Sequence, residues 1–295
     1  MIAIDWGTSS FRAYRLARDG SIVQTRAAPM GIMQVEDGRF AQALQSRIGD
    51  WLAAGETRVL MSGMIGSRQG WKEAPYVSTP AGADAIAAGM VSVAMETGAA
   101  AWIAPGVCTR DAAGVPDVMR GEETQILGVL ESLPVADAWI CLPGTHSKWV
   151  YVRERCIERF TTFMTGEVFA VLKAHSILGR MMDDVAVDLD AFDAGLDAGA
   201  GDGLLHRLFG VRARALFGEL PAGHSGAYLS GLLIGSELAS LPQELDHACL
   251  LGSSELTRLY RHALERRGVR VQSLDQHAAA AGLHILDQTL EHMSP

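Results

Sequence analysis

A strand–turn–strand pattern that occurs twice in the chain is the feature that most constrains its fold. The first copy runs from apolar residues 2–4 through a turn at 7–10 into residues 11–16, and the second covers residues 139–152. Four identical residues recur at a shift of 137 positions: Gly7, Thr8, Ser10 and Tyr14 match Gly144, Thr145, Ser147 and Tyr151. Similarity of this kind in the same local setting predicts two related halves.

Hydrophobic periodicity predicts the elements between and after these copies. In the first half we expect a strand at 21–27, a helix at 40–52, strands at 59–61 and 101–107, and a helix at 122–133. In the second half we expect helices at 207–217, 228–241, 255–266 and 276–290, with strands at 248–251 and 269–271. Residues 62–82 are predicted to form a long loop, and such loops are usually functional. We therefore expect domains at 1–134 and 135–295, and leave open that the last helix packs back on the first domain.

Composition argues against several kinds of partner and site. A net charge of −9 disfavours non-specific binding to nucleic acid. The four cysteines are far apart and form no C-x-x-C pair, which argues against structural zinc and a disulfide framework. The sequence has no signal-peptide pattern at its start and no stretch of roughly 18 apolar residues that could span a membrane. We expect a cytoplasmic protein that binds neither nucleic acid nor membrane, and a homodimer is one assembly compatible with it.

The first turn combines a carboxylate with a group of hydrogen-bond donors. A strand delivers Asp5 to its tip, and the turn that follows contains Gly7, Thr8, Ser9, Ser10 and then Arg12. Backbone and hydroxyl donors in such a turn can bind phosphate oxygens, while Asp5 is a suitable oxygen ligand for Mg²⁺. The Arg12 guanidinium could stabilise a phosphoryl group during transfer. The alternative is an ordinary hairpin turn.

The second turn has the same donors and two additional side chains that can carry positive charge. It consists of Gly144, Thr145, His146, Ser147 and Lys148. Leu142 stands where the first copy has Asp5, so we expect the metal in the first half and phosphate binding in both. For His146 a purely structural role in the turn is an equally good interpretation.

Two glutamates, Glu122 and Glu123, begin the helix predicted at 122–133. One interpretation is stabilisation of the helix dipole. The other is a general base that takes a proton from a substrate hydroxyl. Adjacent helical side chains point about 100° apart, so only one of the two is expected to reach a substrate. The sequence leaves open which one.

Two further segments could bind small molecules. In the long loop, Arg68 could bind a carboxylate, Ser67 and Gln69 could bind hydroxyl groups, and Trp71 could pack on a carbon skeleton. The alternative is a surface loop. Gly252 and Ser253 lie between a predicted strand and helix, where they could form a platform for a nucleotide base or ribose. Taken alone, this second segment is a common connection.

In their order along the chain, these segments resemble the sugar kinase/Hsp70/actin superfamily. Residues 4–12 look like its first phosphate loop, 143–148 like its second and 251–255 like its adenosine loop. Residues 121–123 are similar to the start of the helix that carries the catalytic carboxylate in its carbohydrate kinases. They also resemble the Gly-x-Glu-Glu signature of its exopolyphosphatase branch.

The resemblance to the 2-dehydro-3-deoxygalactonokinase family is closer and covers essentially the whole chain. It is carried by residues 4–9 (IDWGTS), 63–71 (GMIGSRQGW), 119–125 (MRGEETQ), 142–149 (LPGTHSKW), 162–167 (TFMTGE) and 228–235 (YLSGLLIG). It implies an α/β fold of two ribonuclease H-like (actin-like ATPase) domains with a nucleotide cleft between them. It further implies ATP and Mg²⁺ as cofactors, and phosphorylation of 2-dehydro-3-deoxy-D-galactonate at its 6-hydroxyl in galactonate catabolism.

Three other functions are compatible with some of these motifs. A kinase of another small sugar acid would need the same residues. A phosphohydrolase of the exopolyphosphatase type would use the same carboxylate to activate water, but water needs no pocket such as the loop with Arg68 and Trp71. A filament or sensing module would tolerate loss of the base, yet Glu122 and Glu123 are both present.

Overall fold

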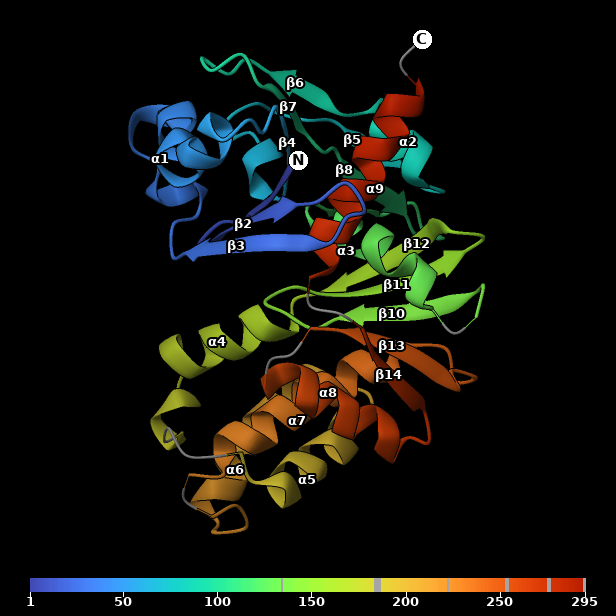
Figure 1. The fold of residues 1–295 in the computed structure, drawn as a ribbon. Helices are drawn as coiled ribbons and strands as arrows, with labels where there is room; N and C mark the ends of the chain where they lie inside the picture. Colours follow the sequence, from blue (N-terminus) through green and yellow to red (C-terminus); the bar gives the residue numbers. More distant parts are fainter. Residues whose placement is uncertain (134, 183–186, 222, 253–254, 275–276, 294–295) are drawn as a thin grey trace. The chain divides into compact units, whose positions relative to one another are not determined.

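A computed structural model describes all residues except 134, 183–186, 222, 253–254, 275–276 and 294–295 (Figure 1). Its contacts divide the chain into two compact units. Unit 1 comprises Met1–Ala138, Val150–Phe160 and Leu274–Pro295, and unit 2 comprises Trp139–Trp149 and Thr161–Ser273. Each unit therefore contains one of the two predicted turns.

The first sheet has six strands in the order β3-β2-β1-β4-β7-β6. Its members are β1 (Ile2–Trp6), β2 (Phe11–Leu16), β3 (Ile22–Ala28), β4 (Arg58–Ser62), β6 (Val91–Val93) and β7 (Ala100–Ile103). The strands β1, β2 and β3 pair antiparallel, whereas β4 is parallel to both β1 and β7. Helix α1 (Phe40–Ala53) buries Phe40, Leu44, Ile48 and Trp51 in the same core as β1. The spacing of these four residues had predicted this helix.

The second sheet repeats this strand order. It runs β12-β11-β10-β13-β14, so its first three strands also lie in reverse order and are followed by the fourth and fifth. Its members are β10 (Ala138–Leu142), β11 (Ser147–Arg153), β12 (Cys156–Phe163), β13 (His247–Leu251) and β14 (Arg270–Leu274). The first and fourth strands are parallel here too, because β10 pairs with β13 as β1 pairs with β4. The repeat confirms the predicted α/β fold with two related halves.

One strand prediction was wrong. Residues 101–107 form no single strand, because β7 ends at Ile103 and the next strand, β8 (Gly106–Arg110), lies in a different sheet. That small sheet has the order β5-β8-β9, with β5 at Tyr76–Ser78 and β9 at Pro116–Met119. Pro105 lies between the two strands, and a proline has no N–H to continue a ladder. The chain changes sheets at this point, and helix α2 (Ala83–Ala88) precedes β6.

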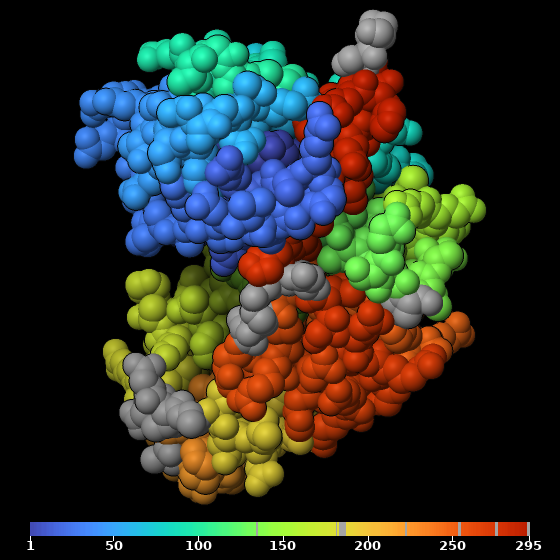
Figure 2. Space-filling model, in the orientation of Figure 1, coloured from blue at the N-terminus to red at the C-terminus, as the bar shows by residue number. Residues whose placement is uncertain are grey.

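Helix α3 (Glu122–Val129) is held in unit 1 by the closing helix α9 (Ala278–Met293). A Cβ atom on Gly128 would lie 1.9 Å from the Ala278 carbonyl oxygen, and one on Gly282 would lie 1.7 Å from the Thr124 carbonyl oxygen. The two helices therefore meet backbone to backbone, which only glycine permits. The outer surface of α9 lies beside the β2–β3 hairpin (Figure 2), and a Cβ atom on Gly20 in that hairpin would lie 2.5 Å from His284 Cδ2. This packing fixes the start of α3, where the two glutamates lie.

The helices of unit 2 pack around α7 (Ser225–Ala239), which is buried on nearly every side. The others are α4 (Thr165–His175), α5 (Leu189–Gly199), α6 (Leu204–Leu216) and α8 (Glu255–Arg266). Glycines let α5 and α7 approach closely, since a Cβ atom on Gly195 would lie 2.1 Å from the Tyr228 carbonyl oxygen. Among the described residues, no helix combines the length and apolar character that are needed to cross a membrane.

Candidate active site

The first predicted turn presents hydrogen-bond donors on the surface of unit 1. The Gly7 N–H donates to the Ser10 carbonyl oxygen at 2.9 Å and closes the turn between β1 and β2. Thr8, Ser9, Ser10 and Arg12 are exposed, while Asp5 is half-buried at the end of β1. Exposed hydroxyls and a guanidinium beside a half-buried carboxylate are the groups that a site for phosphate and metal needs.

Neighbouring backbone holds this turn in place. The Ile32 N–H donates to the Gly7 carbonyl oxygen at 3.0 Å, and the Trp6 indole donates to the Met30 carbonyl oxygen at 3.1 Å. A Cβ atom on Gly31 would lie 2.0 Å from the Thr8 carbonyl oxygen, so this segment packs directly on the turn. The turn is therefore supported from behind as well as by its strands.

Gly63 brings Asp5 close to the start of α3. A Cβ atom on Gly63 would lie 3.4 Å from Asp5 Oδ1, and one on Gly121 would lie 3.1 Å from the Gly63 Cα atom. Burial raises the pKa of Asp5, the positive charge of Arg12 lowers it, and the negative charge of Glu122 raises it. The structure thus places the predicted metal ligand and the predicted base in one region of unit 1.

Glu122 and Glu123 have different surroundings. The Glu123 side chain is fully buried at 0% exposure, and its Oε2 accepts a hydrogen bond from the Gly121 N–H at 2.7 Å. Its Oε1 has no hydrogen-bond partner among the described residues. Glu122 is only partly buried, and its Oε2 accepts from the Arg120 N–H at 3.1 Å. Since a general base must touch its substrate, the geometry favours Glu122 for this role.

The buried carboxyl of Glu123 predicts a dependence of stability on pH. Burial, with a smaller contribution from the charge of Glu122, raises its pKa from 4.5 to about 8. The folded state therefore retains a proton that the unfolded chain releases, so stability is greatest below the unfolded pKa and falls as pH rises from about 4.5 to about 8. Glu123→Gln has no such proton. We expect wild type to lose at least about 1 kcal/mol of unfolding free energy relative to Glu123→Gln between pH 5 and pH 8.

Urea denaturation at both pH values measures this difference. The two proteins differ in one buried group. Contributions from the titration of all other groups therefore cancel when the unfolding free energy of Glu123→Gln is subtracted from that of wild type. A constant difference across this range would show that Glu123 stays ionised in the folded protein.

The long loop places its predicted substrate residues in different surroundings. Arg68 and Gln69 are exposed, and Arg68 Nε pairs with Glu73 Oε1 at 3.1 Å. Ser67 is half-buried, and its hydroxyl has no hydrogen-bond partner among the described residues. Trp71 is partly buried against the core of unit 1, so only part of its ring can face a ligand.

Sequence reasoning missed Arg120, a second cation beside this loop. Its Nη2 donates to the Ala74 carbonyl oxygen at 2.8 Å, and its guanidinium carbon lies 4.4 Å from the centre of the Tyr76 ring. Its Nε and Nη1 have no hydrogen-bond partner among the described residues. Arg120 lies two positions before Glu122 in the family-like string MRGEETQ, and that position was the available signal.

The second turn divides its side chains between the surface and the interior of unit 2. Thr145 and His146 are exposed, and His146 Nε2 is hydrogen-bonded to Glu167 Oε2. Ser147 is fully buried, and its hydroxyl donates to Glu237 Oε2 at 2.8 Å. Lys148 is also buried, and its ammonium donates to the His146 carbonyl oxygen at 3.3 Å. The Ser147 side chain therefore faces the interior, whereas Thr145 faces outward with the turn.

The N-terminus of helix α4 packs against this turn. The Glu167 N–H donates to the Thr145 carbonyl oxygen at 2.9 Å, and a Cβ atom on Gly166 would lie 2.4 Å from the Gly144 carbonyl oxygen. The first N–H groups of a helix and its dipole favour an anion. We did not predict this helix, although its first residues belong to the family-like string TFMTGE. The second turn and the N-terminus of α4 therefore lie directly against each other.

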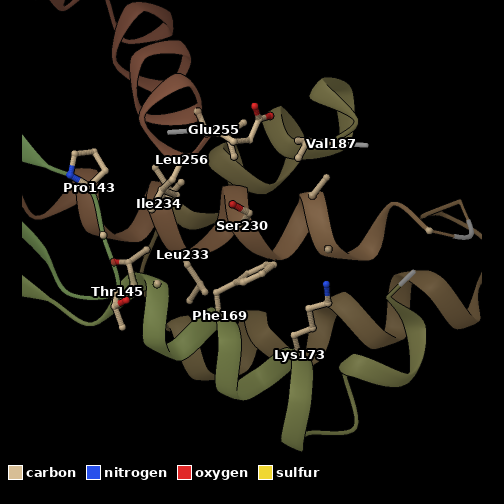
Figure 3. Close-up of a pocket in the computed structure, with 17 residues that line it drawn as sticks. Pro143, Thr145, Phe169, Lys173, Val187, Ser230, Leu233, Ile234, Glu255 and Leu256 are labelled. Atoms are coloured by element: carbon tan, nitrogen blue, oxygen red, sulfur yellow. The ribbon is translucent and has the colours of Figure 1, made fainter. Parts of the chain in front are cut away.

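A cavity of about 560 Å³ begins at the second turn and lies entirely within unit 2 (Figure 3). Phe169, Leu233 and Leu256 are among its apolar walls, while Lys173, Ser230 and Glu255 supply polar groups. Figure 3 shows Thr145 near one end of the cavity and Lys173 near the other. Its volume suits a ligand of nucleoside size. Gly252 directly follows β13, and Ser253 lies outside the described residues.

Comparison with known proteins decides the family. The sequence model of the 2-keto-3-deoxy-galactonokinase family matches residues 5–286. The chain belongs to this family. A protein of Rhizobium meliloti (strain 1021) that is designated a 2-dehydro-3-deoxygalactonokinase is 39% identical over 290 residues, with 95% of this chain and 94% of that protein covered. The 2-dehydro-3-deoxygalactonokinase of Escherichia coli (strain K12) is 37% identical over 277 residues, with 92% of each chain covered.

A solved structure agrees with this assignment. The crystal structure of a protein from Sinorhizobium meliloti, assigned as a 2-dehydro-3-deoxygalactonokinase, superposes with a TM-score of 0.88 at 36% sequence identity. The match covers 100% of this chain and 97% of that one. The predicted family is therefore confirmed. Membership in a family of carbohydrate kinases implies ATP as the phosphoryl donor and a small molecule as the acceptor.

Proposed function

We propose that this chain uses ATP to phosphorylate 2-dehydro-3-deoxy-D-galactonate at its 6-hydroxyl, in galactonate catabolism. The family match and the names of the two curated relatives support this substrate. The structural observation that carries the proposal is the partly accessible carboxylate of Glu122 at the start of α3, in the same region as Asp5. A sugar kinase needs a base that can meet a hydroxyl, and Glu122 can do so.

Unit 1 supplies the groups that act on the acceptor. Glu122 takes the proton of the 6-hydroxyl as that oxygen bonds to the γ-phosphorus of ATP. The bond between the γ-phosphorus and the oxygen that bridges it to the β-phosphorus breaks, and ADP leaves with that electron pair. Arg12 and the exposed hydroxyls of Thr8 and Ser10 would stabilise the charge on the transferring group.

Unit 2 supplies the groups that hold the nucleotide. The cavity walls, including Phe169 and Leu256, would surround the adenosine. Gly144, Thr145 and the N-terminus of α4 would bind the phosphates through backbone and hydroxyl donors. Gly252 and Ser253 stay predictions for the nucleotide platform.

The residues of unit 1 fit a magnesium ion bound together with the nucleotide. The described residues contain no group of three or more His, Cys, Asp or Glu side chains that could hold a metal ion by themselves. Mg²⁺ usually needs only one or two carboxylates, with phosphate oxygens and water as its other ligands. Asp5 would hold it, because its half-buried carboxylate lies beside the first turn, whose exposed donors would bind the phosphates. When bound, the ion would neutralise charge on the phosphates.

The long loop would bind the sugar acid. Arg68 would exchange its partner Glu73 for the substrate carboxylate, since the pair is exposed and a surface pair contributes little. Ser67 and Gln69 would bind hydroxyl groups, and the accessible part of the Trp71 ring would contact the carbon chain. A cytoplasmic location is supported by the use of ATP and by four free cysteine thiols. The homodimer stays a prediction, which sedimentation would test.

An assay of ADP release over a panel of sugar acids tests the proposed function. We expect turnover that requires a sugar acid and is fastest with 2-dehydro-3-deoxy-D-galactonate, and a product phosphorylated at the 6-position by NMR. The epimer 2-dehydro-3-deoxy-D-gluconate is the matched control, because it differs at a single stereocentre. Faster turnover of another sugar acid would identify that acid as the substrate instead. Phosphate release without any acceptor would instead indicate a phosphohydrolase.

A further inference from the structure

One buried carboxylate, that of Glu237 in helix α7, lies beneath the second turn. Its side chain is 3% exposed. Its Oε2 accepts hydrogen bonds from the Ser147 hydroxyl at 2.8 Å, from the Tyr260 hydroxyl at 2.7 Å and from the Thr165 hydroxyl. Its Oε1 accepts from the Trp149 indole at 2.7 Å. Four neutral donors thus converge on one carboxylate.

Two of these donors belong to the elements that begin the cavity. Ser147 belongs to the second turn and is the first residue of β11, and Thr165 is the first residue of helix α4. Thr165 itself lines the cavity, as do Gly144 and Thr145 of the turn. Glu237 does not line the cavity. It therefore connects the turn and the helix N-terminus from behind without reaching the space that a ligand would occupy.

The donor set explains why the residue is a carboxylate. The Trp149 indole can only donate, so one oxygen must face it. Burial raises the pKa of Tyr260, and the neighbouring charge of Glu237 raises it further, so this phenol also remains a donor. A glutamine could present its oxygen to Trp149 or to the three hydroxyls, but not to both groups. In either orientation its NH₂ group would face the Trp149 indole or the hydroxyls, which donate hydrogen bonds to the carboxylate in the wild-type structure.

We propose that Glu237 is a positioning residue for the nucleotide phosphates. It acts through Ser147 and Thr165, holding the second turn and the N-terminus of α4 in the geometry that phosphate binding needs, and it does not touch the nucleotide. This inference rests on the proposed function, in which unit 2 binds ATP. A displacement of backbone donors weakens phosphate binding directly, whereas the sugar-acid residues of unit 1 are unaffected.

Replacement of Glu237 by glutamine tests the inference. We expect Glu237→Gln to raise the KM for ATP and the Kd for ADP about tenfold. This is the effect of losing one hydrogen bond from a displaced backbone donor to a charged phosphate. The KM for the sugar acid should change by less than about twofold. Isothermal titration with ADP gives the Kd without turnover, and thermal unfolding measures stability in the same samples.

A matched control separates positioning from a general loss of stability. Leu238 is the next residue of α7, is 1% exposed and does not line the cavity. Leu238→Ala should destabilise the protein by leaving a space in the core, and should leave the Kd for ADP within about twofold of wild type. If Glu237→Gln changes the Kd no more than Leu238→Ala does, Glu237 has only a structural role and the inference is overturned.

Two further variants keep the test decisive if Glu237→Gln does not fold. Ser147→Ala and Thr165→Val each remove one hydroxyl that donates to Glu237, and each should raise the Kd for ADP severalfold. Ser147→Ala is the more specific test, because Ser147, unlike Thr165, does not line the cavity. Where Glu237→Gln does fold, its combination with Thr165→Val should be less than additive, because both changes break one contact. An unchanged Kd in both single variants would overturn the inference. A wild type that binds no nucleotide would overturn the proposed function, and this inference with it.

Discussion

Replacement of Glu122 by glutamine is expected to lower kcat about 1,000-fold, the effect of removing a general base. The amide has nearly the same shape as the carboxylate but cannot accept the proton of the 6-hydroxyl. Glutamine can still accept the hydrogen bond from the Arg120 N–H through its oxygen, so the start of α3 should keep its structure. Binding of ADP should therefore remain within about twofold of wild type.

Glu123→Gln is the matched control, because it makes the same chemical change one position away. At neutral pH the buried Glu123 carboxyl is largely protonated, since its pKa is raised to about 8. An amide resembles this neutral acid, and the Gly121 N–H can still donate to its oxygen. We expect Glu123→Gln to retain most of its kcat. The opposite result, with Glu123→Gln inactive and Glu122→Gln active, would make Glu123 the base, and activity in both variants would place the base elsewhere.

Measurement of kcat under single-turnover conditions makes the comparison sharper. If product release limits the steady-state rate of wild type, a steady-state assay would understate the loss in Glu122→Gln. Rapid mixing of enzyme with a small amount of labelled ATP and saturating sugar acid reports the chemical step directly. A difference between the two glutamine variants in this assay assigns the proton transfer to one carboxylate.

The sequence was sufficient to predict most strands and the relation between the two halves. The turn motif shared by the two copies is short and local, and its residues are required by backbone geometry. It can therefore be recognised in the sequence without any knowledge of packing. The same holds for α1, whose buried residues Phe40, Leu44, Ile48 and Trp51 recur at helical spacing. These features depend on periods of two and 3.6 residues, which a linear sequence displays directly.

The choice between Glu122 and Glu123 could not be made in this way. Both lie at a helix start, and each has the same local propensity and the same chemical group. What distinguishes them is the tertiary packing around the start of α3, which buries Glu123 completely and Glu122 only in part. Such packing depends on segments far from residues 122 and 123 in the sequence, so the local pattern does not display it.

The cavity and its support were missed for a related reason. Its walls come from α4, α7 and α8 together with the second turn, and Ser147 is 90 residues from Glu237. Helix α5 was also missed, because Gly195 and Gly199 suggest a loop when only local propensity is considered. In the structure these glycines let α5 pack closely on α7, and the gain in packing exceeds their cost within a helix.

Replacement of Asp5 by asparagine is expected to lower kcat at least about 100-fold at limiting Mg²⁺. The amide keeps the shape of the side chain but loses the charge that a hard cation prefers. Burial raises the pKa of Asp5 more than the positive charge of Arg12 lowers it, so the carboxylate still gains from a divalent cation beside it. Asparagine gains nothing comparable, and the apparent affinity for Mg²⁺ should fall with kcat.

Titration of kcat with free Mg²⁺ at saturating ATP and sugar acid measures this effect. Asp19→Asn is the control, because Asp19 is an exposed carboxylate in the hairpin turn between β2 and β3 and lies away from the first phosphate turn. We expect its Mg²⁺ dependence to match wild type, while that of Asp5→Asn shifts to higher concentrations. Binding of ADP without Mg²⁺ should be similar in all three proteins, since the nucleotide cavity lies in unit 2. If Asp5→Asn keeps the wild-type rate at every Mg²⁺ concentration, the ion is held by other groups and Asp5 has only a structural role in β1.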